Sequence, residues 1–297
     1  MHLPADVAAW RNAGRMVRTP AGEVFTRVVP GDGEPLLLLH GYPSSSFDWR
    51  FVMDELRGRH LVTLDFVGFG LSVKPSGHRY SLFEQADVVA AVLDELDVSS
   101  VRVASHDMGT SVATELMARD IDGTLPFGLS QVVLGNGSVI VERASLRPIQ
   151  KLLRTPLGPL ASRLSNPRMF RREFAALFSD AHPLTRDEAD AQWALLHHHE
   201  GHRRAHETIS YIGERISHAG RWHGAVRDWP KPLGFLWATG DIVATTNVLA
   251  GLQELRPAAP TVELPGLGHY PQLEDPAAYT AGLLRLLEPS GGAGLPD

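Results

Sequence analysis

The sequence predicts an α/β protein with a mostly parallel, doubly wound sheet and one inserted block of helices. Short apolar runs alternate with longer amphipathic segments along most of the 297 residues, which is the pattern of repeated strand–helix–strand units. The alternation stops between about residues 139 and 229, where helical periodicity continues without a convincing strand. We therefore expect a core made of residues 1–138 and 230–297, with residues 139–229 forming a helical cap.

The expected strands are short and apolar, and several end in a polar or glycine-containing turn. Residues 35–39 form a continuous apolar run followed by His40-Gly41, as expected for a strand that is buried on both faces. The other expected strands are residues 61–64, 100–104, 131–134, 233–237 and 261–264. Helices are expected at residues 80–96, 110–119 and 276–287, and a disordered tail is expected at residues 290–297.

The composition argues against several classes of function. Apolar residues make up 43% and charged residues 21% of the chain, which is typical of a globular protein with a substantial core. The formal charge of −6 argues against a nucleic-acid partner, and the absence of cysteine excludes disulfides and thiol catalysis. Residues 1–18 have no apolar signal segment, and no apolar run approaches the roughly 20 residues that cross a bilayer. We therefore expect a cytoplasmic protein without a membrane span, as a monomer or homodimer.

The run Ser105-His106-Asp107-Met108-Gly109 lies between an expected strand and an expected helix. This is the small-x-nucleophile-x-small pattern of a nucleophile elbow, in which the chain turns sharply from strand to helix. Bulky side chains two positions on either side of the central residue would clash, which explains Ser105 and Gly109. Asp107 is therefore the candidate nucleophile, and its simplest alternative role is that of a helix N-cap.

An aspartate nucleophile suits a particular chemistry. Its carboxylate is already ionised at neutral pH and needs no base for the first attack. It is a poor nucleophile for amides and simple esters, but it suits an sp3 carbon that bears a leaving group or belongs to a strained ring. The positive N-terminal end of the following helix also favours a negative charge at this position.

Asp241 and His269 follow Asp107 in the order nucleophile, acid, histidine that accompanies such an elbow. Asp241 ends the turn after the expected strand 233–237, and His269 lies in a glycine-rich loop after the expected strand 261–264. Both positions are at the carboxyl ends of strands, where open α/β sheets build their sites. Each residue alone has little specificity, but the three in this order predict a catalytic triad.

Two backbone N–H groups are expected to form an oxyanion hole. In this arrangement the loop after the leucine-rich strand supplies one N–H and the residue after the nucleophile supplies the other. These residues are Tyr42, in the run His40-Gly41-Tyr42-Pro43, and Met108. A tight turn explains His40 and Gly41 equally well.

These motifs resemble the epoxide hydrolase and haloalkane dehalogenase branch of the α/β-hydrolase superfamily. The likeness runs from His40 to the last expected helix and includes residues 65–72, with the sequence DFVGFGLS. Residues 80–86, 105–107 and 269–276 look most like the mesoderm-specific transcript protein-like hydrolases. The resemblance implies an α/β-hydrolase fold with an active site between the core and an inserted helical cap.

Two departures from this branch bear on the substrate. Haloalkane dehalogenases usually place a Trp after the nucleophile to hold the halide, and haloacid-type members place an Arg there, whereas this chain has Met108. Epoxide hydrolases use two cap tyrosines that donate hydrogen bonds to the epoxide oxygen. Tyr211 lies in a segment that resembles the one carrying the second tyrosine. The first has no matching tyrosine, so that either a histidine or water would replace it or the chemistry would differ. Tyr211 is therefore the candidate donor, with helix packing as its alternative role.

Further candidates for the pocket are His40, His106, Asn136, Trp193 and Trp222. For the two tryptophans, ordinary packing in the protein interior is the alternative. Three histidines, His198, His202 and His206, would share a helix face that could bind a metal, but their spacing is not that of HExxH. We expect a solvated or cleft-facing cap helix there, and neither a metal nor an organic cofactor.

The favoured hypothesis is an epoxide hydrolase. Asp107 would open a small apolar epoxide and form a covalent alkyl-enzyme ester, with Tyr211 meeting the alkoxide. His269, oriented by Asp241, would then activate water, and a vicinal diol would leave. One alternative keeps the ester but cleaves a carbon–halogen bond, as in haloalkane dehalogenases. Another is a non-catalytic small-molecule binder on a hydrolase scaffold, against which the intact triad counts.

Overall fold

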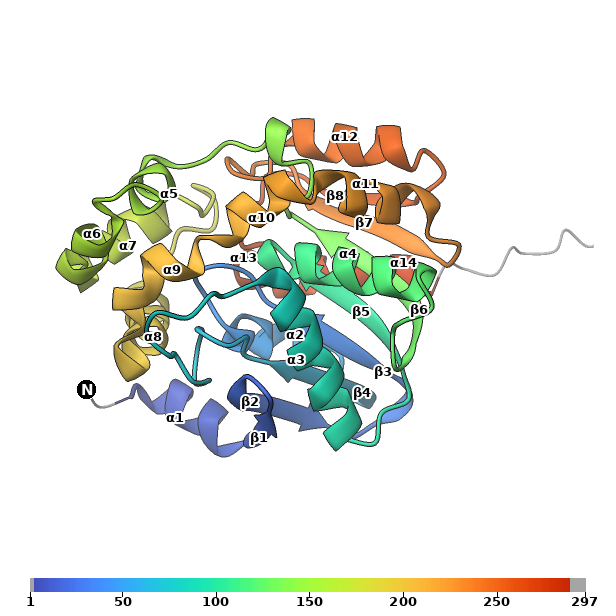
Figure 1. Ribbon diagram of the computed structural model, residues 1–297, viewed down its shortest axis with the longest axis horizontal. Helices are drawn as coiled ribbons and strands as arrows, with labels where there is room; N and C mark the ends of the chain where they lie inside the picture. The colour runs from blue at the N-terminus through green and yellow to red at the C-terminus, as the bar shows by residue number, and fades with distance from the viewer. Residues whose placement is uncertain (1–2, 289–297) are drawn as a thin grey trace, which may run out of the picture.

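The computed structural model describes residues 3–288, and their centre is a sheet of eight strands (Figure 1). The strand order is β1-β2-β4-β3-β5-β6-β7-β8. Strand β2 pairs antiparallel with β1 and β4, and all other neighbouring pairs are parallel, which confirms the mostly parallel sheet. The strands are β1 Arg15–Thr19, β2 Gly22–Val29, β3 Asp32–Leu39, β4 Arg59–Leu64, β5 Ser100–His106, β6 Gly128–Gly135, β7 Leu233–Ala238 and β8 Thr261–Leu264.

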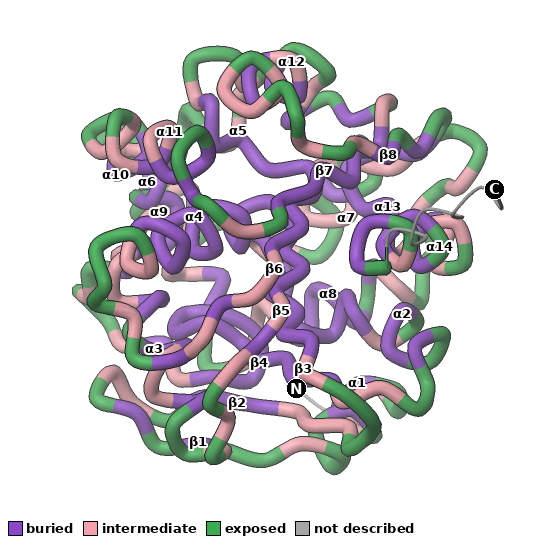
Figure 2. The backbone as a smooth tube through the Cα atoms, turned by 90° about the vertical axis from the view of Figure 1, so that its right-hand side faces the viewer, coloured by how far each residue is buried: buried purple, intermediate pink, exposed green. Residues whose placement is uncertain are grey.

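Helices cover both faces of the sheet, as a doubly wound fold requires. One face carries α3 Leu82–Glu95, α4 Met108–Ile121, α11 Ala219–Asp228 and α12 Thr246–Leu255. The other face carries α1 Ala5–Asn12, α2 Arg50–Glu55 and α14 Pro276–Leu287. Buried backbone gathers in the middle of the molecule, and the exposed segments lie mainly in the surrounding loops and outer helix turns (Figure 2).

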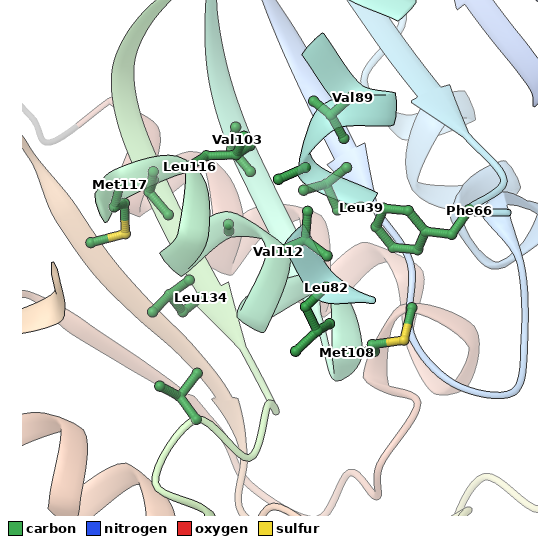
Figure 3. Close-up of a cluster of buried hydrophobic side chains, with 14 of the residues drawn as sticks. Leu39, Phe66, Leu82, Val89, Val103, Met108, Val112, Leu116, Met117 and Leu134 are labelled. Atoms are coloured by element: carbon green, nitrogen blue, oxygen red, sulfur yellow. The ribbon is translucent and has the colours of Figure 1, made fainter. Parts of the chain in front are cut away.

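The leucines of strand β3 contribute to the cores on both faces of the sheet. Because successive side chains of a strand point to opposite faces, Leu37 and Leu39 join the core beneath α3 and α4. Leu36 and Leu38 join the core beneath α1 and α14. Figure 3 shows the first of these cores, where Leu39 lies among side chains of α3, α4 and β5. The apolar run therefore fixes the strand in the centre of the sheet, with its carboxyl end at the site described below.

The elements expected for the core are present. Each expected apolar run lies within one of the strands β3 to β8, and the three expected helices correspond to α3, α4 and α14. Strands β1 and β2 and helices α1, α2 and α12 were not expected. In β1, buried Val17 lies between exposed Met16 and Arg18, an alternation too short to be distinctive without its partner strand. The expected disordered tail, residues 290–297, lies outside the described residues.

The segment between β6 and β7 contains helices and irregular chain but no strand. Its last helix, α11, packs on α4 in the layer over the sheet. Helices α5 to α9 lie instead to the left of the sheet in Figure 1. The helices before α11 are η2 Val141–Arg143, α5 Pro148–Leu153, α6 Gly158–Leu164, α7 Pro167–Ala175, α8 Arg186–His197, η3 His198–Arg204, α9 Ala205–Thr208 and α10 Tyr211–Ser217.

The regular helix expected through the histidine-rich segment is wrong. Helix α8 ends before His198, and His199 and Glu200 adopt left-handed φ angles of 50° and 58°, which break the helical path. His198, His202 and His206 therefore do not share one helix face. Among residues 3–288, no group of three or more His, Cys, Asp or Glu side chains could hold a metal ion. In the same part of the chain, no helix is both long and apolar enough to cross a bilayer.

Candidate active site

Asp107 occupies a sharp turn between β5 and α4. Strand β5 ends at His106 and α4 begins at Met108, while Asp107 has φ 45° and ψ −111°, a conformation that side chains rarely adopt. A Cβ atom at Gly109 would lie 2.6 Å from the backbone oxygen of Leu39, so glycine is required there. The strained strand-to-helix turn of a nucleophile elbow is therefore present, held in place by the packing around it.

The carboxylate of Asp107 does not cap the helix that follows it. The residue is only 4% exposed, and its Oδ2 atom accepts a hydrogen bond of 2.9 Å from the N–H of Tyr42. The other oxygen, Oδ1, lies 3.8 Å from Nη2 of Arg215. A backbone donor and a guanidinium thus both face the carboxylate. The side chain makes no hydrogen bond to the helix that follows it, so the N-cap alternative does not apply.

His269 and Asp241 form a buried pair beside this elbow. Nδ1 of His269 lies 2.7 Å from Oδ2 of Asp241. Burial lowers the pKa of His269, but the charge of Asp241 and this hydrogen bond outweigh burial, so the pKa lies above its ordinary value. Burial raises the pKa of Asp241, but the charge of His269 and the same hydrogen bond reverse that effect, so its pKa lies below the usual value. The pair can therefore take up a proton at Nε2, as a general base must.

Asp241 is held from its other side by Asn136 and two backbone groups. Asn136 donates from Nδ2 to Oδ2 of Asp241 at 2.9 Å, while the N–H groups of Val243 and Ala244 donate to Oδ1 at 2.7 and 3.1 Å. Asn136 also accepts a hydrogen bond of 2.8 Å from the N–H of Ala238, which anchors it to β7. Expected as a pocket residue, Asn136 instead holds the carboxylate of Asp241, the candidate acid, and does not line the cavity.

His40 and His106 support loops of the site. The N–H of Phe66 donates to Nε2 of His40 at 3.0 Å, so Nδ1 carries the proton and donates to the carbonyl oxygen of Gly41 at 2.8 Å. Nε2 of His106 donates to the carbonyl oxygen of His269 at 2.7 Å and so fixes the loop that carries this histidine. Burial lowers the pKa of His40 to about 3 and that of His106 to about 4, so both rings are neutral at pH 7. Neither lines the cavity, contrary to expectation.

The two expected oxyanion donors adjoin Asp107. The N–H of Tyr42 points to its carboxylate, as described above. Met108 is the first residue of α4, so its N–H has no acceptor within the helix. The Met108 side chain is buried in the core near Leu82, so only its backbone faces the site (Figure 3). Stabilisation of an oxyanion by these two N–H groups remains a prediction.

A cavity between the core and the cap reaches Asp107 and His269. Tyr42 lines it from the core side, while Arg147 and Glu173 lie in the cap wall and form an ion pair of 3.3 Å. Most of the remaining wall is apolar. Its apolar side chains include Pro43, Phe69, Ile149, Leu153, Ala161, Met169, Phe170, Phe174, Leu177, Leu196 and Val243. Such a cavity suits a small, largely apolar organic molecule.

The two tryptophans expected in the pocket lie elsewhere. The ring of Trp193 packs against Phe170 and His202, with centroids 5.7 and 5.6 Å apart. Trp222 is fully buried, and its indole N–H donates to Oε2 of Glu115 at 2.9 Å. Neither side chain lines the cavity, so packing accounts for both.

Tyr211 lies close to Asp107 but is not part of the cavity wall. It begins α10, is 1% exposed, and its ring centroid lies 5.8 Å from that of Tyr42. Its hydroxyl makes no hydrogen bond with any residue in the described range 3–288. Burial first, and then the charge of Asp107, raise the pKa of Tyr211 well above its ordinary value. Tyr211 is therefore a protonated, buried donor beside the candidate nucleophile.

Arg215 is a site residue that was not expected from the sequence. It is 2% exposed, and it donates from Nη2 to the backbone oxygen of Asp107 at 3.1 Å and from Nε to Oγ of Ser111 at 2.7 Å. Its guanidinium carbon lies 4.6 Å from the centroid of the Tyr211 ring. Tyr211 and Arg215 are four positions apart on α10, so they share a helix face, and this spacing is the only signal in the sequence.

The alpha/beta hydrolase family matches residues 36–282 of the chain. The protein named "Putative hydrolase LipZ" of Mycobacterium tuberculosis (strain ATCC 25618 / H37Rv) is 62% identical over 282 residues, which cover 95% of this chain and 98% of that protein. The mesoderm-specific transcript protein of Mus musculus is 32% identical over 298 residues, which cover 94% of this chain and 88% of that protein. Both relatives extend over the core and the cap.

The solved structures include proteins of the same fold at lower identity. Haloalkane dehalogenase DbeA from Bradyrhizobium elkani USDA94 has a TM-score of 0.78 at 22% identity, covering 94% of this chain and 99% of that one. The sheet order, the elbow and the two relatives agree with the family match, which spans most of the sequence. The chain therefore belongs to the alpha/beta hydrolase family.

Proposed function

We propose that this hydrolase opens epoxides to vicinal diols through a covalent ester on Asp107. The observation that carries the proposal is a carboxylate at a strained elbow, with His269 in the wall of the same apolar cavity. A serine or cysteine at this position would need a base before it could attack, whereas a carboxylate does not. The proposal therefore assigns His269 to the second half of the reaction only.

In the first half-reaction, an oxygen of Asp107 attacks one carbon of the epoxide. A carbon–oxygen bond forms, the ring carbon–oxygen bond breaks, and its electron pair remains on the ring oxygen. That oxygen takes a proton from a tyrosine hydroxyl. Oδ1 is the proposed attacking atom, because Oδ2 already accepts the N–H of Tyr42. The result is an ester between the enzyme and a hydroxyalkyl group.

In the second half-reaction, His269 takes a proton from water, and the hydroxide attacks the carboxyl carbon of Asp107. The N–H groups of Tyr42 and Met108 are proposed to stabilise the tetrahedral oxyanion, and one such donor is typically worth about 3 kcal/mol. As the intermediate collapses, the bond between the carboxyl carbon and the substrate oxygen breaks, and that oxygen takes the proton of the newly added hydroxyl, so the diol leaves and Asp107 is again a carboxylate. The proton on His269 then returns to the tyrosinate, so protons and electrons balance over one turnover.

Two tyrosine hydroxyls are proposed to meet the ring oxygen. Tyr42 lines the cavity, with its ring 5.8 Å from that of Tyr211, the donor expected from the sequence. Tyr211 does not line the cavity, so the proposal requires its hydroxyl to turn toward the cavity when substrate binds. Burial first, and then the charge of Asp107, raise the pKa of both phenols, so each keeps its proton until an alkoxide forms. In this proposal Tyr42 supplies, from the core, the second hydroxyl for which the cap has no matching tyrosine.

The test is a substrate panel with purified wild-type protein. Aryl and alkyl epoxides, haloalkanes and a p-nitrophenyl ester are supplied separately, and diol, halide and nitrophenol are measured. We expect diol from at least one epoxide, and we expect Asp107→Ala to reduce its formation by about 10³-fold or more. The matched control is Asp54→Ala, which removes an exposed carboxylate and should leave the rate unchanged.

Three outcomes would contradict epoxide hydrolysis. Halide release without diol formation would assign the same ester intermediate to dehalogenation. Nitrophenol release that survives Asp107→Ala would remove the aspartate from the chemistry altogether. Tight binding of these compounds with no product from any of them would favour a non-catalytic binder.

A further inference from the structure

The cap carries a concentration of exposed apolar side chains. Of the ten large apolar side chains that are exposed among residues 3–288, five lie within helices α5 to α7 or the turn between α5 and α6. They are Leu152, Leu157, Leu160, Leu164 and Met169, with exposed fractions of 39%, 61%, 56%, 62% and 48%. We call these five residues the cap patch. Scattered apolar residues need no explanation on a protein surface, but a contiguous group of them indicates a contact surface.

Helix α6 and its N-cap place three of the five cap-patch residues on one face. Leu157, Leu160 and Leu164 are spaced by three and four residues, so their side chains lie along one side of the helix. Ser162 of the same helix is buried, and Ala161 lines the cavity. The helix therefore has an inner side that faces the cavity and an outer apolar side that is more than half exposed.

The same segment is strongly basic. Residues 147–172 contain seven Arg or Lys and no Asp or Glu, in a chain whose formal charge is −6. Arg147 and Arg171 form ion pairs, with Glu173 and Asp190. The other five are exposed and form no ion pair with any residue in the range 3–288: Lys151, Arg154, Arg163, Arg168 and Arg172. The cap patch is thus surrounded by unpaired positive charge.

The cap patch also adjoins the cavity. Met169 is 48% exposed and at the same time lines the cavity that contains Asp107. Ile149 and Leu153, from the helix that carries Leu152, line it as well. Helices α5, α6 and α7 project at the left end of the molecule, away from the sheet (Figure 1). A surface that received the cap patch would therefore lie next to the cavity.

We propose that the cap patch docks the protein on an anionic lipid surface. Leucine side chains interleaved with arginine and lysine match such a surface, because the apolar groups enter the acyl boundary while the cations meet lipid phosphates. A nucleic acid would use the charges but would leave the leucines in water. The docking is peripheral and does not depend on the proposed reaction, since it uses none of the catalytic side chains.

The experiment is vesicle flotation with the full chain. Vesicles of phosphatidylcholine containing phosphatidylglycerol are compared with vesicles of phosphatidylcholine alone, at low and high salt. We expect binding to the anionic vesicles that weakens at high salt, because exposed charges are then screened. The variant Leu157→Ser/Leu160→Ser/Leu164→Ser and the variant Lys151→Gln/Arg163→Gln/Arg168→Gln are each expected to bind at least about tenfold more weakly.

Matched controls change the same residue types elsewhere on the surface. Met16→Ser/Phe51→Ser/Ile121→Ser removes three exposed apolar side chains, and Arg11→Gln/Arg15→Gln/Arg18→Gln removes three exposed cations that form no ion pair within the described residues. Both controls should bind vesicles like the wild type. Melting temperatures of all four variants, measured without lipid, establish that each is folded.

The proposal is overturned by any of three results. The first is no binding to anionic vesicles by the wild type, and the second is equal loss of binding in the cap-patch variants and the controls. The third is a dimer in light scattering without lipid that the leucine variant dissociates, together with no vesicle binding. That last result would assign the cap patch to contacts between two copies of the chain.

Discussion

Helices α8 and α10 are joined to the core by buried polar contacts, whereas α5, α6 and α7 present exposed leucines and arginines. On α10, Glu214 accepts hydrogen bonds from the N–H of Leu82 at 2.7 Å and from the Ser81 hydroxyl at 3.2 Å. On α8, Gln192 donates to Asp48 at 2.7 Å in a buried contact. No comparable buried link to the core is formed by the outer side of α5 to α7 within residues 3–288.

This difference indicates that the two parts of the cap have different roles. Buried hydrogen bonds of charged groups are directional, so they fix Tyr211 and Arg215 against Asp107. Exposed apolar groups are only partly covered within the chain and can bury more area against a partner surface. The inner cap, which we define as helices α8 and α10, should therefore govern the rate of the reaction and the stability of the fold, and the outer cap, helices α5 to α7, should govern neither.

The largest effect is expected from His269→Gln, which acts on the core side of the site. Glutamine keeps a polar side chain but cannot take the proton from water, so we expect turnover to fall by about 10²- to 10⁴-fold. The first half-reaction does not need His269, so the covalent ester should accumulate. Intact-protein mass spectrometry during incubation with a confirmed substrate measures it. A slow variant without an adduct would contradict the assigned role.

The next largest effect is expected from replacing Arg215, the buried cation of the inner cap. We expect Arg215→Met to lower the free energy of unfolding by about 3 kcal/mol, because a buried carboxylate loses its neighbouring charge and Asp107 loses a backbone partner. Urea unfolding measures the change. The control Arg171→Met breaks an exposed pair with Asp190 and should cost less than about 1 kcal/mol. An equal loss of unfolding free energy in the two variants would show that the inner and outer cap do not differ in this respect.

Tyr211→Phe removes the hydroxyl but leaves the ring and its packing in place. The hydroxyl has no hydrogen-bond partner among residues 3–288, so the melting temperature should stay unchanged. We expect kcat to fall about ten- to a hundredfold with little change in KM, because the hydrogen bond to the alkoxide exists only as the ring opens. Steady-state kinetics with a confirmed epoxide decide this. An unchanged kcat would mean that Tyr211 has only a packing role.

The pH dependence tests the coupling of His269 to Asp241. The neutral imidazole is the active base, so the rate of ester hydrolysis should fall as the pH falls through the pKa of His269. Because Asp241 raises that pKa, the acid limb should lie above the ordinary histidine value of about 6.5. In Asp241→Asn, the burial that remains should move the limb to lower pH. An acid limb below that value in the wild type would show that the pair is not coupled as described.

The smallest effect is expected from the outer cap. Leu157→Ser, Leu160→Ser and Leu164→Ser should each change the free energy of unfolding by less than about 0.5 kcal/mol, because each side chain is more than half exposed. Leu116→Ala, in the core beneath α4, should cost about 2 to 5 kcal/mol by the same measurement. A large loss in the outer variants would mean that these leucines pack within the monomer.

Most of the core and the positions of the candidate triad residues could be predicted from local sequence. The leucine run that ends at His40 indicates a buried strand, because few other elements use five consecutive apolar residues. The elbow around Asp107 carries its signature within five residues, since Gly109 is demanded by the backbone oxygen of Leu39. Asp241 and His269 follow from the order that this elbow requires.

The inner cap could not be predicted in the same way, because its contacts depend on how distant helices dock. Arg215 lies 108 positions from Asp107 in the chain, and nothing in its own segment tells which partner its helix face meets. His199 and Glu200 break a helix that the local pattern favours, because a left-handed φ at a residue other than glycine has only a weak signal in the sequence. Trp193 and Trp222 were wrong as pocket candidates because the sequence predicts that a tryptophan is buried but does not tell whether its ring faces the cavity.

The most direct test of the account is a single turnover in water labelled with heavy oxygen. Enzyme in excess over a confirmed epoxide is digested, and the peptide that contains Asp107 is weighed by mass spectrometry. The account predicts one heavy oxygen in the Asp107 carboxylate and none in the diol, since hydroxide attacks the carboxyl carbon of the ester. A labelled diol with an unlabelled Asp107 would mean that water attacks the substrate directly, and the covalent mechanism would be wrong.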